Sequence, residues 1–257
     1  MAMYDVVPNY TLGRGMLFFA KFAENTTTPG PRRLLGNCPE FSLTASVNTL
    51  DHFSSMRGVR EKDASVQLDN TQTAQIVCDD IQLENLALFF FGEVSDFVDA
   101  GGTVTDEVHA DVVQGSYYQL GRTPQNPMGA RGLSAVTVEI GAVLQTIEED
   151  YQIDLETGML YIVPGGGIAD GTDLNVTYTR AAATQQRVLS GTKPIEGELY
   201  YREENAEGVS RDMLLPSVKL SPNGDLGMIS DDWRRIPFNV EILKKTGHAA
   251  VYISDRP

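Results

Sequence analysis

The residue types that most often carry catalysis or bind metals follow no catalytic spacing in this sequence. The three histidines, His52, His109 and His248, form no HxxxH or HExxH pattern, the spacing that brings two imidazoles to one metal ion. No GxSxG nucleophile turn is present. The triple glycine at 165–167 is not followed by the helix and the Lys-Ser/Thr pair of a phosphate-binding loop. We therefore interpret the histidines as surface or loop residues and the glycines as a turn.

Adjacent carboxylates occur at three places in the chain. They are Asp79-Asp80, Glu148-Glu149-Asp150 and Asp231-Asp232. A glycosidase needs two carboxylates that face each other across a cleft, whereas neighbours on a strand point to opposite faces. A calcium loop of the DxDxDG type is also absent from the sequence. The sequence thus predicts a protein that is not an enzyme and that has no cofactor and no metal.

The single tryptophan, Trp233, lies between an acidic pair and the basic pair Arg234-Arg235. Such an aromatic could recognise a ligand, but it more often packs at the corner of a sheet, and we favour that interpretation.

The stretch from Glu40 to Gly92 predicts the elements around which the chain is organised. Apolar and polar residues alternate over 41–48, which predicts a strand with one apolar face and one face of Ser, Thr and Asn. Residues 64–76 repeat this pattern. Between the two strands, Thr49–Asp63 carries charges of both signs and is predicted to be a long loop.

A short helix is predicted after the second strand, with Asp79-Asp80 as its N-cap and Gly92 as its stop. Residues with helical spacing form the face expected to meet the core: Leu83, Leu86, Ala87 and Phe90. Three further apolar residues exceed what one face needs: Leu88, Phe89 and Phe91. They predict a helix interface covered by another subunit, and the alternative is a helix buried within its own domain.

Charge and composition exclude several classes of protein. The 257 residues carry a formal charge of −15, and no Lys or Arg occurs between Asp63 and Gly121. A protein that wraps nucleic acid needs a basic surface, so this class is not expected. No signal peptide is apparent, and the longest apolar run, Leu86–Phe91, is too short to span a membrane. Cys38 and Cys78 favour free thiols in a reducing compartment over a disulfide.

The acidic middle of the chain has a different character from its flanks. Short alternating strands and turns recur over residues 117–184 about every ten residues, which is typical of a small β-sandwich. We interpret 117–184 as an inserted β domain, on the outer surface, within a discontinuous β-sandwich domain formed by 1–116 and 185–257.

The order of elements in the chain resembles that of the major tail tube proteins of long-tailed bacteriophages. The resemblance covers roughly two thirds of the chain and rests on the order of short segments rather than on one motif. These segments are Leu12-Gly13-Arg14-Gly15, Gly36-Asn37, Thr44 to Asp51, His52-Phe53-Ser54-Ser55, Gly58, Lys62-Asp63, Glu84-Asn85-Leu86-Ala87-Leu88, and Gly197 to Ile242.

The resemblance implies a mainly β fold, an antiparallel β-sandwich with one flanking α-helix, together with the inserted small β-sandwich. It implies a structural virion protein that forms stacked, hexameric rings, the tail tube through which DNA passes without specific binding. The implied partners are further copies of the chain, the tail tape measure protein, and the tail terminator and distal tail proteins. The implied location is the virion tail, assembled in the host cytoplasm, with no membrane partner.

Within this interpretation, the Thr49–Asp63 loop is an arm that contacts the next subunit, through Arg57, Arg60, Glu61, Lys62 and Asp63. Glu196 and Glu198 share a strand face with few basic neighbours in the sequence and are the candidates for the lumen face. The alternative function is a virion decoration or receptor-binding module whose insert recognises a host-surface carbohydrate. An enzyme acting on bacterial polysaccharide ranks last.

Overall fold

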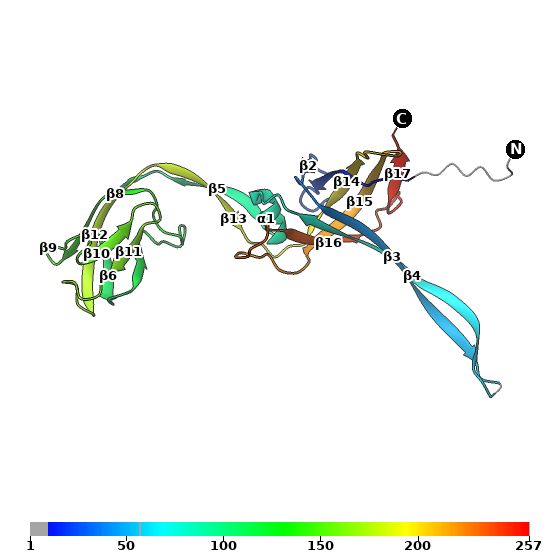
Figure 1. Ribbon diagram of the computed structural model, residues 1–257, viewed down its shortest axis with the longest axis horizontal. Helices are drawn as coiled ribbons and strands as arrows, with labels where there is room; N and C mark the ends of the chain where they lie inside the picture. The colour runs from blue at the N-terminus through cyan, green and yellow to red at the C-terminus, as the bar shows by residue number, and fades with distance from the viewer. Residues whose placement is uncertain (1–9, 57, 257) are drawn as a thin grey trace. The chain divides into compact units, whose positions relative to one another are not determined.

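The computed structural model describes residues 10–56 and 58–256 and is mainly β, with 54% strand and 3% helix (Figure 1). The predicted mainly β class, with antiparallel sheets and a single helix in the described part, is confirmed. The chain divides into two compact units, the first formed by Met1–Ser95 with Arg187–Pro257 and the second by Asp96–Gln186.

One antiparallel sheet carries the first unit. Its path runs β2-β1-β14-β15-β16-β4-β3, and a further strand, β17, pairs with β15. The strands are β1 (Gly15–Lys21), β2 (Arg33–Leu34), β3 (Glu40–Ser54), β4 (Glu61–Cys78), β14 (Ile195–Glu203), β15 (Arg211–Pro222), β16 (Ile236–Ile242) and β17 (Tyr252–Asp255). Alternate residues of β14 and β16 are buried, as a sheet with one covered face requires.

The helix α1 (Leu83–Phe89) covers part of this sheet, and its orientation differs from the prediction. Leu88 and Phe89 are buried in the core of their own unit, where the Phe89 ring lies 6.4 Å from that of Phe238. Phe91 is half-buried and packs against the same core, whereas Phe90 is 43% exposed. The predicted subunit interface of Leu88, Phe89 and Phe91 is therefore wrong, and these side chains stabilise the unit itself.

The ends of α1 also differ from the prediction. Gln82, rather than Asp79-Asp80, is the N-cap residue, and it makes no side-chain cap bond. At the other end, Phe91 takes the left-handed conformation (φ 53°), with hydrogen bonds from Phe91 N to Leu88 O and from Gly92 N to Ala87 O. This is the Schellman arrangement with phenylalanine at the position that glycine usually takes. Gly92 is needed for another reason, because a Cβ there would lie 1.8 Å from the backbone oxygen of Leu189.

A buried asparagine attaches α1 to the rest of the unit. Asn85 is fully buried, and its Nδ2 donates to the backbone oxygens of Leu35 (2.8 Å) and Asp80 (2.9 Å). Its Oδ1 accepts a bond from the Arg33 guanidinium at 2.7 Å. Leaving such buried groups unpaired is costly, so this side chain fixes the helix against β2 and the segment that follows β4.

We expect Asn85→Ala to lower the free energy of unfolding of the first unit by about 2–3 kcal/mol, because it removes the donor from one buried and one partly buried carbonyl group. Urea titration followed by circular dichroism measures the change. Asn70→Ala, at an exposed position of β4, is the control and should change the value by less than about 0.5 kcal/mol. Equal effects of the two substitutions would contradict the structural role of Asn85.

The second unit is a sandwich of two antiparallel sheets around its own core. One sheet has the order β10-β11-β7 and the other β6-β12-β8-β9. The strands are β6 (Gly102–Val112), β7 (Tyr117–Gln119), β8 (Leu133–Ile140), β9 (Val143–Leu144), β10 (Tyr151–Asp154), β11 (Met159–Ile162) and β12 (Thr172–Arg180). The core between the sheets includes fully buried Leu160, Val176 and Tyr178.

The predicted boundary at residue 117 is wrong, because the second unit begins at Asp96. Residues 102–112, which the prediction assigned to the first domain, form β6 and pair with β12. Register shifts in this pairing and left-handed conformations at Asp106 and Asp111 interrupt the alternation by which a strand is recognised. The strands β5 (Glu93–Asp99) and β13 (Ala183–Leu189) pair where the chain passes between the units.

We expect the first unit to fold without the second. Replacing residues 100–182 by a short Asn-Gly turn would let β5 and β13 continue as a hairpin. Because the two units have separate cores, the shortened protein should be soluble and unfold cooperatively, as calorimetry measures. Aggregation, or loss of the cooperative transition, would show that the units depend on each other for folding.

Candidate functional site: an extended hairpin arm

The most unusual feature of the first unit is the length of the hairpin formed by β3 and β4. The two strands have 15 and 18 residues and remain paired from Glu40↔Val77 to Ser54↔Glu61. The hairpin extends beyond the other strands of its sheet (Figure 1). The predicted Thr49–Asp63 loop is therefore wrong, since most of it belongs to the two strands. We call residues 42–54 and 61–72 the arm.

Both faces of the arm are exposed to solvent. Each residue of β4 from Glu61 to Thr71 is exposed, and β3 beyond Phe41 is exposed except at half-buried Asp51 and Ser54. A two-stranded ribbon without a covering layer is at best marginally stable in water. The arm thus holds its form through cross-strand contacts and has two free faces.

Apolar side chains lie on both faces of the arm, and the register of the arm is interrupted by a bulge at Leu68 of β4. Residues directly opposite each other share a face, and the pairing shifts between Asn48 and Thr49. Before the shift, Val47 (56% exposed) lies on the same face as Leu43. After it, Leu50 (62% exposed) and Val66 (60% exposed) face each other on the opposite side. In β4 the bulge places Val66 on the face opposite to Ala74, and in β3 the odd spacing places Leu50 on the face opposite to Val47.

The charged residues predicted to contact a neighbouring subunit have partners within the arm. Lys62 Nζ lies 2.6 Å from the Asp51 carboxylate, which lowers the pKa of Asp51 below its usual range. His52 Nδ1 lies 2.5 Å from Asp63, and the Arg60 guanidinium lies over the ring of Phe53 at 5.3 Å.

The other predicted residues of this group are placed as follows. Glu61 begins β4 and is exposed. Glu61, Lys62 and Asp63 are therefore strand residues rather than loop residues. Arg57 lies outside the described residues.

The polar face predicted for the two strands is present near the body of the sheet. Ser42, Thr44 and Ser46 lie opposite Gln75, Thr73 and Thr71. The hydroxyl groups of Ser46 and Thr71 are 2.7 Å apart. Hydroxyl and amide groups thus form a continuous wet surface on this side of the hairpin.

Glu196 and Glu198 share one face of β14, but basic residues accompany both. The Arg32 guanidinium donates to Glu198 at 2.8 Å, and Lys219 lies directly opposite Glu196. Neither basic neighbour could be identified from the local sequence, because Arg32 is 166 residues from Glu198 and Lys219 belongs to another strand. The expectation of few basic neighbours was therefore wrong. Arg32 also lies over the Tyr200 ring at 4.3 Å, so Glu198 is part of a structural cluster.

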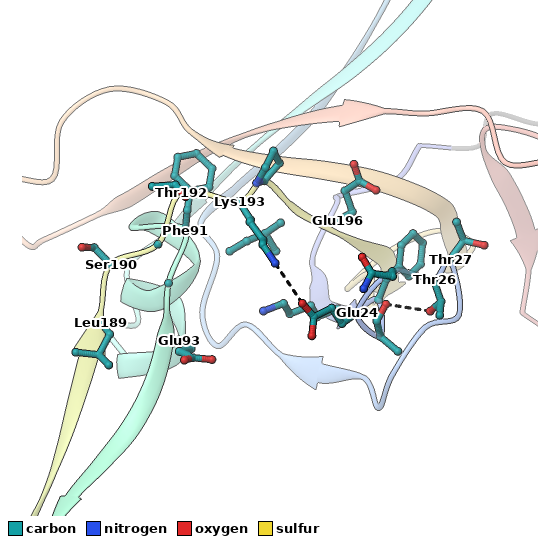
Figure 2. Close-up of a pocket in the computed structure, with 18 residues that line it drawn as sticks. Glu24, Thr26, Thr27, Phe91, Glu93, Leu189, Ser190, Thr192, Lys193 and Glu196 are labelled. Carbon is teal, nitrogen blue, oxygen red and sulfur yellow. Dashed lines mark hydrogen bonds and ion pairs between the residues drawn. The ribbon is translucent and has the colours of Figure 1, made fainter.

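A cleft of about 1250 Å³ opens in the first unit beside the end of α1 (Figure 2). Its lining comes from the end of β1, the turn after α1 and the start of β14, and it includes Phe91 and Glu196. Lys193 and Glu24 form an ion pair at 3.2 Å in this lining, with side chains 86% and 78% exposed. Solvent screens so exposed a pair, so the cleft contains both charges without a fixed binding geometry.

The remaining motifs of the sequence have structural roles or lie at the surface. Backbone N–H groups of Thr146 and Gly167 donate to the Asp150 carboxylate and lower its pKa, and Gly166 and Gly167 pack closely against this residue. Trp233 is 86% exposed, so its predicted packing at a sheet corner is wrong.

His109 lies 3.1 Å from Glu107, which also accepts the Tyr178 hydroxyl. Residues 10–56 and 58–256 contain no group of three or more His, Cys, Asp or Glu arranged to hold a metal ion. None of the helices described is long and apolar enough to cross a membrane.

Comparison with known proteins identifies the family but gives no activity. The family model "Protein of unknown function UCP028589" matches residues 10–254. The chain belongs to this family. A search of curated proteins gives no match. The matched residues include the arm and nearly all of the described strands of both units.

At the root of the arm, two free cysteines are adjacent. Cys78 ends β4 and is fully buried, Cys38 precedes β3 and is half-buried, and their sulfur atoms are 2.7 Å apart. The contact with Cys38 and burial raise the pKa of the Cys78 thiol, so the Cys78 sulfur reacts slowly at neutral pH.

We expect glutathione disulfide to convert Cys38 and Cys78 slowly into an intramolecular disulfide, releasing two molecules of glutathione. Mass spectrometry after alkylation should show the loss of two hydrogen atoms and no alkylated cysteine. Cys38→Ser is the control and should leave an alkylatable Cys78 after unfolding. Recovery of both free thiols in the wild type after prolonged oxidation would contradict their adjacency.

Proposed function

We propose that this protein is a structural subunit that assembles as stacked, hexameric rings into a tube of the kind formed by the tail tube proteins of long-tailed bacteriophages. The observation that carries the proposal is the arm, which has two solvent-exposed faces and apolar side chains on each. Such a ribbon gains stability when a neighbouring copy covers it, since that contact removes Leu50, Val66 and Val47 from water. For this reason, the arm is the element that we propose forms contacts between copies of the chain.

The edges of the sheet support the same proposal. The terminal strands of its path are β2, which has two residues, and β3, which contains neither Lys nor Pro. Natural monomers usually protect a long edge with such residues or with a covering element. Pairing of edges between copies would close the sheets into a ring and leave no free edge.

In this proposal the Ser, Thr and Gln face of β3 and β4 lines the lumen, together with exposed Glu196. Hydroxyl, amide and carboxylate groups suit a wet channel that conducts DNA without binding it, and the positive charge of Lys219 on this face lies directly opposite the Glu196 carboxylate. Glu198, held by Arg32, is at the border of this surface. The tape measure, terminator and distal tail proteins are the further partners proposed, and the virion tail is the proposed location.

The proposal predicts that Leu50→Asp with Val66→Asp prevents assembly without unfolding the subunit. The two carboxylates would face each other in any covered interface, where burying charge is costly. Negative-stain micrographs and light scattering at high protein concentration should show rings or tubes for the wild type. The double variant should give monomers with an unchanged circular dichroism spectrum.

Ile229→Asp is the matched control, because Ile229 is 99% exposed and lies outside the arm. It should assemble as the wild type does. A wild-type protein that stays monodisperse and monomeric at millimolar concentration would contradict the proposal, and binding to host polysaccharide by that monomer would favour a receptor-binding module instead.

A further inference from the structure

The small sheet of the second unit has an aromatic outer face. Leu160 and Ile162 of β11 are fully buried in the sandwich core, so Tyr161 between them points outward. Tyr161 lies directly opposite Tyr117 of β7 and Gln152 of β10. The two tyrosine rings stack with centroids 4.6 Å apart and planes 36° from parallel, and Tyr117 is 67% exposed.

A pocket of about 360 Å³ lies beside this ring pair, large enough for a small organic molecule. Its lining is formed by Tyr117, Tyr161, Met159, Ile153, Gln152, Glu148 and Asp154. The lining thus contains two aromatic rings, a thioether and two carboxylates, and it contains no Lys or Arg. Anionic ligands would find two negative charges there and no positive one.

The two carboxylates are fixed in different ways. Glu148 accepts a hydrogen bond from Gln152 Nε2 at 3.1 Å on one oxygen, and its backbone N–H is bonded to Tyr151. Asp154 is held by its own turn, where bonds from Thr157 lower its pKa and keep it ionised. Glu148 therefore offers a positioned oxygen to a ligand, while Asp154 contributes charge.

The charge of the whole second unit also favours a cationic ligand over an anionic one. Residues 96–186 contain thirteen Asp and Glu, three Arg and no Lys. Such a surface raises the local concentration of cations and repels anions. Cations also bind to the faces of aromatic rings, and Tyr is among the residues that hold them best.

We propose that this pocket binds a small organic cation, a free alkyldiamine whose ammonium group meets Glu148 and the Tyr161 ring and whose carbon chain packs against Tyr117 and Met159. The assignment rests on charge complementarity and on the aromatic pair, and it is independent of assembly.

Isothermal titration of the full-length protein with 1,5-diaminopentane tests the site, with 1,5-pentanediol as the neutral probe of the same length. We expect the diamine to bind, the diol not to bind, and added salt to weaken the binding. Tyr161→Phe should keep the affinity, whereas Tyr161→Leu should reduce it about three- to fivefold. Circular dichroism checks that each variant is folded.

Glu148→Gln and Glu149→Gln form the matched pair, because they remove the same charge from adjacent exposed residues of which only Glu148 lines the pocket. We expect weaker binding for Glu148→Gln alone. Equal losses of affinity in both variants would show that the acidic surface attracts the diamine in general, and would overturn the proposed site. Absence of diamine binding, equal binding of the diol, or binding only of a lysine-rich peptide would also overturn it.

Discussion

Where a hairpin extends beyond the other strands of its sheet, the side chains of each of its two strands must find their contacts in the other strand. This constraint governs the first unit. At the root, Ala74 and Ile76 of β4 are paired on both sides and buried. Farther out the contacts are hydroxyl pairs and ion pairs across the two strands, such as Ser46 with Thr71 and Asp51 with Lys62. Cross-strand pairs of this kind contribute fractions of a kcal/mol each. The root is therefore anchored, whereas the apolar groups of the arm have no layer to cover them.

The sequence predicted strands correctly where one face of the strand is buried. It did not predict them where both faces are exposed. Alternation identified the strands through Phe41 and Ile76, because burial selects apolar residues at every second position. Neither face of the arm is buried, so burial selects no apolar positions there. Charged residues occur on both faces around Asp51 and Lys62. Such residues are typical of loops, although here they pair across strands. The bulge at Leu68 also reverses the face on which the apolar residues of β4 fall.

The other differences have comparable local causes. With 7 residues, α1 makes fewer than two turns, so helical spacing alone does not decide which residues of the apolar run Leu86–Phe91 face the core. Phe91 lies beyond the helix in a left-handed conformation that the residue type does not indicate. The buried role of Asn85 depends on Arg33 and on a carbonyl group 50 residues away, which no local pattern contains. The aromatic pocket requires Tyr117 and Tyr161 to be neighbours in space, and only the pairing of β7 with β11 provides that.

Charge determines which surfaces of this protein can approach one another in the assembly that we propose. A chain with a formal charge of −15 repels its own copies, and the second unit carries much of that charge. The arm is different, because its acidic residues are accompanied by nearby basic ones and the pairs Asp51–Lys62 and His52–Asp63 form within it. Covering such a surface removes apolar area from water without bringing together unpaired like charges. The same residues that made the arm resemble a loop in the sequence thus make it the surface best suited to contact another copy.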